Sequence, residues 1–403
     1  MSALIEALLL QAGYNAALVA VGAMLLGIAA GVAGTFLFLR KRALVSDAVA
    51  HATLPGIGLA FIVMVLLGWD GRNLVILMLG ATVTAVLGLF AVEWISRRTR
   101  LAEDAAIGAV LSVLFGFGVV LLTIIQTLSA GRQAGLESFL LGSTAGMLFA
   151  DAVVILIGGS IAVALVVLLR RPMTMVSFDP EFAQSYGISV RSLDLLIMAL
   201  VTAVTVIGLK IVGLILIVAM LIIPAVAARF WTNRTDRVVV VAGLIGGASG
   251  YIGSAVSASA PSLPTGPIIV LVCFVLFVVS LFFAPNRGVL ASALRQRGFQ
   301  LRVHRRQGLL AIAHDEPIFD RLTLAVLRRA GFIRRDGVPT EAGRAQAAKA
   351  LRDERRWDIV RKVHKDDAIA GQYDGLTSIE AVLTRDEIAE IDRQIGRPVE
   401  VPS

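Results

Sequence analysis

Long apolar runs separated by short polar stretches are the main pattern of this chain. A run of roughly 17–25 apolar residues is long enough to cross a bilayer as a helix. Such runs occur at 16–39, 48–67, 74–94, 106–128, 151–169, 193–209, 211–230, 238–257 and 267–284. The sixth and seventh belong to one apolar block that only Gly208, Lys210 and Gly213 interrupt, so they are either two short spans or one long bent helix. We therefore expect about nine transmembrane helices, within a range of eight to ten.

Small residues are dense within these runs. In the absence of a hydrophobic force between helices in lipid, small residues allow backbones to pack closely. Glycines are concentrated in the first run and the eighth, at Gly22, Gly27, Gly31, Gly34, Gly243, Gly246, Gly247, Gly250 and Gly253. This pattern predicts a tight helix interface and not a ligand site.

The last 117 residues have a different composition. Residues 1–286 carry 15 Lys and Arg and 12 Asp and Glu, whereas 287–403 carry 22 and 17. The change predicts a transmembrane domain over 1–286, a basic juxtamembrane linker over 287–306 and a soluble domain over 307–403. Cys273 is the single cysteine, which excludes an intramolecular disulfide, and the start of the chain lacks the features of a cleaved signal peptide.

Basic residues in the short loops predict the orientation. Twelve Lys and Arg residues lie in the loops after the first, third, fifth and seventh runs, against three in the alternate loops. Cytoplasmic loops carry the excess of positive charge. We expect the N-terminus outside and the C-terminal part in the cytoplasm.

Asp47 and His51 are the clearest candidate chemistry in the apolar half. They are four residues apart, so on a helix they share one face, one turn apart. A carboxylate and an imidazole in this arrangement are ligands for a divalent transition metal. The alternative is structural: Asp47 favours the positive end of the helix dipole and His51 packs near the headgroups.

A short cytoplasmic helix is predicted between the fifth and sixth spans. Asp179 suits an N-cap, Pro180 the first helical position and Gly187 the C-terminal stop. A helix of about two turns is marginal alone, so it requires a partner surface.

Several motifs resemble one transporter family. The segment 46–56 reads Ser-Asp-Ala-Val-Ala-His-Ala-Thr-Leu-Pro-Gly and resembles the signature of ABC permeases that take up zinc, manganese or iron. The segments 103–108, 212–225 and 263–267 fit the same family, and the resemblance extends over about 16–284. It implies an all-α polytopic permease that forms a dimer with itself or a paralogue, two separate ATPase subunits and an extracytoplasmic metal-binding protein.

The resemblance also implies roles for particular residues. Asp47 and His51 match the positions through which the metal passes. The cytoplasmic helix resembles the family's coupling helix, which sits in a groove of the ATPase, with residues Asp179, Pro180, Glu181, Phe182, Ala183 and Gly187. The chain has no Gly-x-x-x-x-Gly-Lys-Ser/Thr phosphate loop, so we expect ATP hydrolysis on a separate chain and no permanently bound cofactor.

The C-terminal part, about 300–395, resembles the winged-helix α/β domain of iron- and manganese-dependent repressors. The similarity lies in 339–344, 355–358 and 379–383. Arg355 and Ala381 stand where those repressors place ligand histidines, which makes a second, regulatory metal site doubtful, although Glu380 and His364 remain as candidate ligands. Docking or dimerisation is the favoured role of this domain.

The stretch 287–306 contains six arginines and no acidic residue. Such a juxtamembrane run favours anionic lipids, by about 1 kcal/mol per charge. Nucleic-acid binding is the less favoured interpretation, because the domain is tethered to a membrane and its charge balance is mild.

The overall expectation is a multi-pass permease subunit in a bacterial cytoplasmic (inner) membrane, carrying manganese, zinc or iron. Two alternatives remain at this stage. One is a permease for vitamin B12 or iron chelates, which would not need Asp47 and His51. The other is a membrane-tethered metal sensor, which would not need so many spans.

Overall fold

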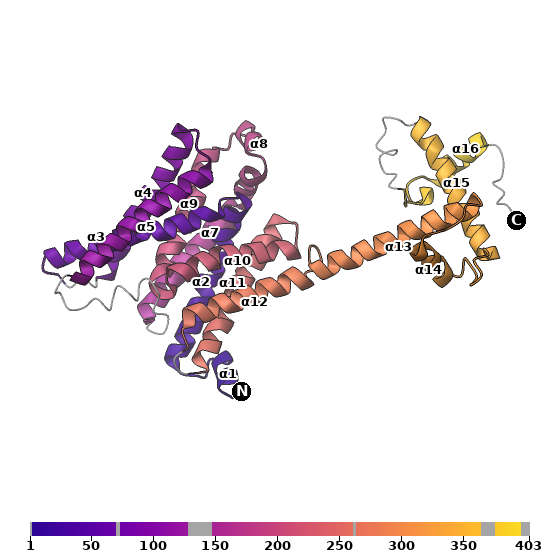
Figure 1. Cartoon of the computed structure of the whole chain (residues 1–403). Helices are drawn as coiled ribbons and strands as arrows, with labels where there is room; N and C mark the ends of the chain where they lie inside the picture. The colour runs from indigo at the N-terminus through magenta and orange to yellow at the C-terminus, as the bar shows by residue number, and fades with distance from the viewer. Residues whose placement is uncertain (1, 70–72, 128–146, 261–262, 364–374, 396–403) are drawn as a thin grey trace. The chain divides into compact units, whose positions relative to one another are not determined.

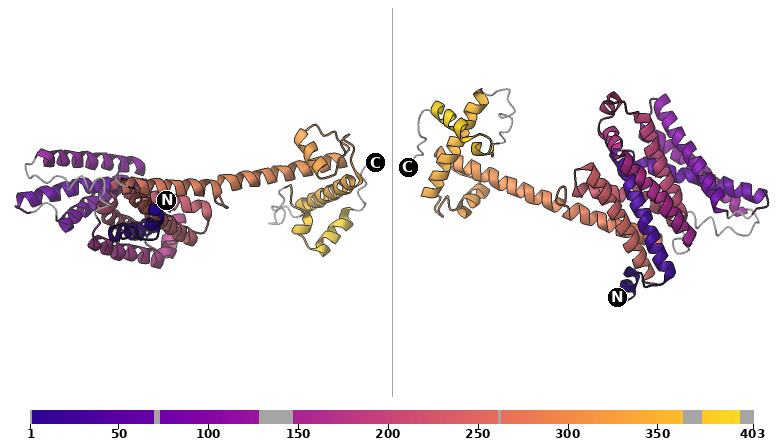
Figure 2. Two further views of the ribbon diagram at one scale, coloured as in Figure 1. Left: turned by 90° about the horizontal axis from the view of Figure 1, so that it is seen from below. Right: turned by 180° about the vertical axis from the view of Figure 1, so that it is seen from behind.

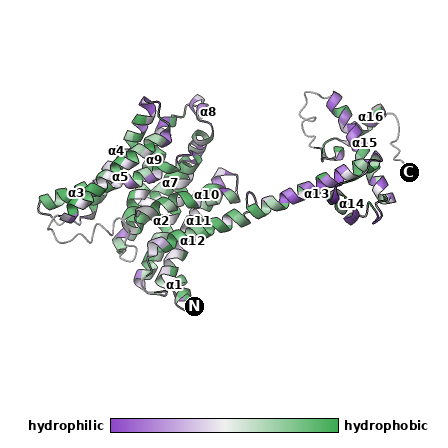
Figure 3. Ribbon diagram, in the orientation of Figure 1, coloured by the Kyte–Doolittle hydropathy of each residue, from purple (hydrophilic) through white to green (hydrophobic). Residues whose placement is uncertain are grey.

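The computed structural model describes residues 2–69, 73–127, 147–260, 263–363 and 375–395. The chain divides into two units, Met1–Ala291 and Ser292–Ser403. The helices of the first unit are largely hydrophobic along their whole length, whereas α14 and α15 in the second are largely hydrophilic (Figure 3).

Helix α2 (Tyr14–Leu39) is the centre of the first unit. It packs on α7 (Phe149–Phe178), α9 (Val190–Val212), α10 (Leu214–Trp231) and α11 (Thr235–Ala258). Helix α12 (Thr265–Phe283) covers α10 and α11, and the short α1 (Ser2–Leu8) contacts α11 (Figure 1). Fifteen residues of α2 are buried, as expected for a helix surrounded on most sides.

The interface between α2 and α11 depends on glycine. A Cβ at Gly27 would overlap the carbonyl oxygen of Gly246, and a Cβ at Gly246 would overlap that of Gly27. A Cβ at Gly250 would likewise overlap the carbonyl oxygen of Ala23, and a Cβ at Gly31 would overlap that of Ala242. The prediction of a tight helix interface from the glycine pattern is confirmed for these positions.

Three helices form a second group. Helix α3 (Ala43–Leu66) packs against both α4 (Leu74–Arg98) and α5 (Glu103–Thr127), which also contact each other. They lie side by side in the views of Figures 1 and 2. Helix α9 joins this group to the first, because it contacts α2 and α7 as well as α3 and α4.

The apolar block that the sequence left as one helix or two is divided at Gly213. Its backbone has φ 79° and ψ 170°, a conformation that favours glycine. Helix α9 ends before it and α10 begins after it. Eight described helices are long and apolar enough to cross a membrane, and α10 has 18 residues. The all-helical polytopic fold is therefore confirmed, with eight clear spans within the predicted range.

Arginines at the α2–α3 turn are held by ion pairs. Arg40 donates to Asp194 of α9 at 2.7 Å and to the carbonyl of Val176 at 2.7 Å. Arg42 pairs with Glu103 of α5 at 2.8 Å and with Asp194 at 3.5 Å. These contacts fix the start of α3 relative to α5 and α9.

The second unit contains α14 (Arg321–Arg329), α15 (Glu341–Val363) and α16 (Arg385–Ile395), together with most of α13 (Val289–Ala313) and the 3₁₀ turn Ile379–Ala381. One apolar cluster joins α13, α14 and α15 through Leu309, Ile312, Leu327, Phe332, Ala347 and Leu351. A second forms around Trp357, Val360 and Ile379. The stretch predicted as a linker, 287–306, is thus mostly helix.

The predicted α/β winged-helix character of the C-terminal domain is not supported. Over the described part of this unit there is no strand, and one isolated antiparallel bridge joins Ile333 to Pro339. The intervening turn closes through the Arg334 amide and Val338 carbonyl at 2.9 Å, and α15 begins at Glu341. On the other side of the bridge the Thr340 amide donates to the Phe332 carbonyl at 2.9 Å, and the pairing goes no further.

Docking of α16 on α15 is expected to depend on pH. The Nε and Nη2 atoms of Arg356 donate to the two carboxylate oxygens of Asp392 at 2.7 and 2.6 Å, and these hydrogen bonds lower the pKa of Asp392. A lowered pKa in the folded state gives stability that is present at neutral pH and is lost as pH falls through it. Since an ordinary aspartate titrates near about 4, we expect the amide protection factors of 385–395 to fall below that pH.

The effect is modest because Asp392 is half exposed. About 1 kcal/mol, or roughly fivefold in the opening equilibrium, is the expected size. Asp392→Asn should show the reduced protection already at neutral pH, whereas Asp386→Asn on the same helix should behave as the wild type. Equal protection at neutral pH in Asp392→Asn and wild type would show that the ion pair contributes nothing.

Candidate metal centre

Asp47 and His51 lie one turn apart near the start of α3. The Oδ1 atom of Asp47 is 3.4 Å from Nε2 of His51. Two donor atoms that each lie about 2.1 Å from one metal ion, at octahedral or tetrahedral angles, are about 3.0–3.4 Å apart. The pair is therefore spaced as two ligands of a single divalent ion.

The pair lies on the open face of an otherwise buried helix segment. The side chains of Asp47 and His51 are 41% and 22% exposed, whereas Ala48, Val49, Ala50 and Ala52 are buried. The exposed Leu44 continues the same face by one turn. Donor atoms on this face can be reached from outside the single chain.

The imidazole of His51 is positioned by packing. Its ring meets that of Phe115 on α5 edge to face, with centroids 4.8 Å apart and planes at 81°. The Nδ1 atom is buried and has no hydrogen-bond partner among the residues that the structure describes. Phe115 thus fixes the ring while Nε2 faces Asp47.

Helix α3 continues through the site without a break. It runs from Ala43 to Leu66 with Pro55 inside it. Proline has no backbone N–H, so the carbonyl of His51, four residues earlier, lacks its usual helical donor. At 1.5 Å per residue, His51 lies about 12 Å along the helix from Ala43, which is beyond the turn that carries Arg42.

The described residues contain no cluster of three or more His, Cys, Asp or Glu side chains that could hold a metal. Asp47 and His51 are two candidate ligands, fewer than the four of a closed structural zinc site. Such a site suits a transient ion better than a resident one.

The short helix predicted after Asp179 forms as α8 (Pro180–Ser185). The Oδ1 atom of Asp179 accepts from the amide of Phe182 at 2.9 Å, and Gly187 has φ 82°. Ala183 is buried and Glu181 is exposed. The exposed rings of Phe182 and Tyr186 stack, with centroids 6.1 Å apart.

Sequence reasoning missed Phe115 and the pairing of Glu103 with Arg42. Phe115 lies in the middle of an apolar run on another helix, and nothing in its spacing marks it as a neighbour of His51. Glu103 was noted as part of a motif. The structure gives it a structural contact, the 2.8 Å ion pair with Arg42. His364 lies outside the described residues, and Glu380 pairs with Lys349 at 3.2 Å.

A family model described as "ABC 3 transport family" matches residues 14–284. The chain belongs to the ABC 3 transport family. The match contains both ligand candidates and α8. It ends before the second unit, and neither the comparisons nor the all-helical described part of that unit supports the predicted resemblance to metal-dependent repressors.

Relatives in this family carry metal-transport names. The chain is 41% identical over 310 residues to a manganese transport system membrane protein, MntC, of Bacillus subtilis, covering 76% of this chain and 70% of that protein. It is 38% identical over 288 residues to a zinc transport system membrane protein, TroC, of Treponema pallidum, covering 72% and 95%.

Two solved structures share the fold. PsaBC from Streptococcus pneumoniae in complex with Fab superposes with a TM-score of 0.58 and 29% identity, covering 67% of this chain and 91% of that one. An inward-facing conformation of a putative metal-chelate type ABC transporter gives a TM-score of 0.53 at 16% identity, covering 65% and 84%. The second likeness concerns the fold alone.

Proposed function

We propose that this ABC 3 family permease subunit imports manganese or zinc and that Asp47 and His51 bind the ion on its way. The observation that carries the proposal is the 3.4 Å spacing of a carboxylate oxygen and an imidazole nitrogen on an open helix face. Iron remains a third candidate from the motif, since Asp and His suit several divalent ions.

Two ligands from one chain are fewer than a divalent ion usually has in a protein. Because Asp47 and His51 lie on an open helix face, further ligands can come from another subunit. A second permease copy or a paralogue that faces Asp47 and His51 would bring its own donors to the same ion. A site shared in this way binds weakly enough to release the ion when the subunits move. An extracytoplasmic metal-binding protein would deliver the ion to the outer side.

As a permease subunit, the chain is not itself the ATPase. ATP hydrolysis belongs to a separate chain of the importer, and α8, with Asp179, Pro180, Glu181, Phe182, Ala183 and Gly187, is the proposed coupling element. The Asp179 cap stabilises the start of the helix, and the buried Ala183 packs against the permease. The exposed Phe182 and Tyr186 are available to a partner.

Replacing both Phe182 and Tyr186 with serine is expected to uncouple the permease from its ATPase. Large aromatic side chains contribute most of the energy at protein interfaces, so binding of the purified ATPase should weaken at least about tenfold, which is about 1.4 kcal/mol. Binding can be measured by titration of the detergent-solubilised permease.

Phe319→Ser, at an exposed aromatic of the second unit, is the matched control and should leave binding unchanged. Wild-type ATPase affinity in the Phe182→Ser/Tyr186→Ser variant would exclude α8 as the coupling element.

The remaining assignments concern placement in the membrane. We infer a multi-pass protein of the cytoplasmic (inner) membrane with its N-terminus outside and its C-terminal unit in the cytoplasm. In this proposal 1–286 is the permease domain, the basic stretch 287–306 lies near anionic lipid headgroups, and 307–403 is a docking or dimerising module without a nucleic-acid partner.

The transport assignment is tested by metal accumulation, element by element, in cells with and without this protein. Loss of the protein should lower manganese or zinc selectively. Unchanged contents of manganese, zinc and iron under limitation of each metal would contradict the proposal.

A further inference from the structure

The helices α13 and α15 face each other along a seam that changes character part-way. One half is apolar, with Ile312 on α13 packed in the same cluster as Ala347 and Leu351 on α15. The other half is charged and hollow. Its residues follow helical spacing on both helices, Arg302, Arg305, Arg306 and Leu309 on α13 and Gln346, Lys349, Ala350 and Asp353 on α15.

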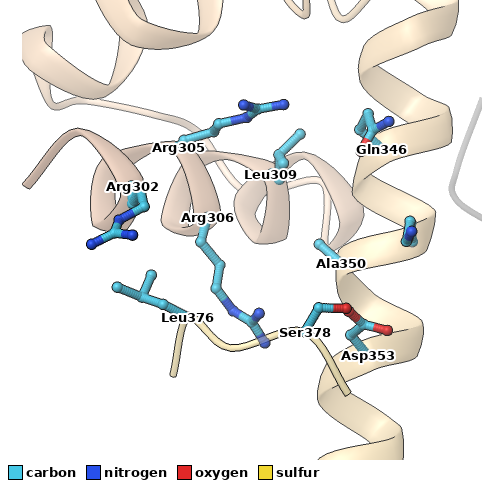
Figure 4. Close-up of a pocket in the computed structure, with 10 residues that line it drawn as sticks. Arg302, Arg305, Arg306, Leu309, Gln346, Ala350, Asp353, Leu376 and Ser378 are labelled. Atoms are coloured by element: carbon cyan, nitrogen blue, oxygen red, sulfur yellow. The ribbon is translucent and has the colours of Figure 1, made fainter. Parts of the chain in front are cut away.

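These residues surround a cavity of about 340 Å³, with Leu376 and Ser378 as a third wall. Figure 4 shows the three arginines extending from one helix, with Arg306 reaching toward the segment that carries Leu376 and Ser378. The volume is at the lower end of the range for small-molecule sites, about 300–1,000 Å³.

Four cations and one carboxylate line this space. Lys349 pairs with the exposed Glu380 at 3.2 Å, and the guanidinium of Arg305 lies 5.0 Å from the centroid of Phe332. No ion pair among the described residues includes Arg302. Like charges that line one cavity repel each other, and an anion between them would reduce this repulsion.

Asp353 adds a buried hydrogen-bond acceptor to the cations that line the cavity. It is 5% exposed, and its Oδ2 accepts from Ser378 at 3.1 Å. Its Oδ1 is buried with no hydrogen-bond donor in the described part of the chain, and Arg356 Nη1 lies 3.6 Å from it as an ion-pair partner. A buried acceptor without a donor is unfavourable, and a ligand hydroxyl or amine could supply one.

We propose that this cavity binds a small molecule that carries a phosphate group together with a hydroxyl or amine donor. The cations of the lining, Arg302 and Lys349 among them, supply the donors for the phosphate oxygens, for which arginine has matching bidentate geometry. Asp353 accepts from the donor at the other end. The proposal does not depend on which metal the permease carries.

The phosphate can come from two sources, a soluble nucleotide or the headgroup of an anionic lipid. Three of the six arginines in the stretch 287–306 line the cavity. These arginines can therefore bind either a lipid headgroup or a soluble phosphate. The experiment separates the two sources.

A hydrogen bond beside the cavity connects its third wall to α15. The indole Nε1 of the buried Trp357 donates to the carbonyl of Thr377 at 3.0 Å, and Thr377 lies between the wall residues Leu376 and Ser378. A ligand that orders this wall should slow amide exchange in 376–383 and in the facing part of α15, 346–353.

The full-length chain in lipid nanodiscs is the sample, and hydrogen–deuterium exchange of those two segments is the measurement. One arm uses neutral phosphatidylcholine with ADP or inorganic phosphate at millimolar concentration. The other replaces part of the neutral lipid with phosphatidylglycerol and adds no soluble phosphate. We expect at least about fivefold slower exchange in one arm, which identifies the source.

Arg302→Gln and Lys349→Gln should each remove the protection, because both side chains are exposed and their loss leaves the apolar clusters intact. Arg297→Gln, the same charge change on α13 outside the cavity, is the matched control and should retain it. Absence of protection in both arms, or protection that persists in Arg302→Gln and Lys349→Gln, would overturn the proposal.

Discussion

Replacing His51 with alanine is expected to reduce metal accumulation to background, more than about tenfold below wild type, while the importer still assembles. In the proposed site, the substitution removes the imidazole and leaves the Asp47 carboxylate as the one remaining ligand from this helix. It leaves a small, half-open gap beside Phe115 and breaks no hydrogen bond of Nδ1. Uptake of radioactive manganese or zinc by cells is the measurement.

The matched control is His314→Ala, which removes an exposed imidazole directly after the end of α13 in the second unit. It should transport normally. Gel filtration of the purified complex must show His51→Ala assembled. Wild-type uptake in the assembled His51→Ala complex would exclude the imidazole from the transport step.

Replacing Gly246 with leucine is expected to abolish folding of the permease domain. Any Cβ at this position overlaps the carbonyl of Gly27 on α2, and backbone cannot yield as a flexible side chain does. The helices would have to separate along the most extensive interface of α2, at a cost beyond the 1–3 kcal/mol of ordinary overpacking. We expect at least a tenfold loss of monodisperse protein in detergent.

Gly116→Leu is the control for this result, because a Cβ at Gly116 on α5 meets nothing within 4 Å. It adds the same side chain to a membrane helix and should be recovered at wild-type yield. A Gly246→Leu protein that is recovered folded and active would show that α2 and α11 are not packed at this distance.

Elements with a strong hydrophobic pattern were predictable from the sequence. Each predicted run lies within or closely overlaps a helix from α2 to α12, because a bilayer-spanning helix must be apolar over its full length. The start of α8 after Asp179 was also indicated, since it depends on local capping preferences. The block around Gly213 was left open between two short spans and one bent helix, and the structure divides it at Gly213.

Features that depend on contacts between distant segments were not predictable. The edge-to-face contact of Phe115 with His51 joins two residues that are 64 positions apart in the chain. The spacing of apolar residues around them does not indicate this contact. The arginines of 287–306 suggested a membrane-facing stretch, but their i, i+3, i+4 spacing directs three of them to a seam with α15.

The C-terminal prediction was wrong in its strand content for a related reason. Short motif matches around 339–344 suggested the end of a β-wing, yet the described segment is a tight turn with one bridge between Ile333 and Pro339. A motif of a few residues does not determine whether a ladder extends beyond its first pair, which depends on the length of chain between α14 and α15.

The most direct test of the account is the coordination of a bound ion by His51. Pulsed electron paramagnetic resonance of the assembled importer with one equivalent of Mn²⁺ should show coupling to an imidazole nitrogen in the wild type. We predict that this coupling disappears in His51→Ala and persists in His314→Ala. A nitrogen coupling of equal strength in wild type and His51→Ala would contradict the assignment of the metal site to Asp47 and His51.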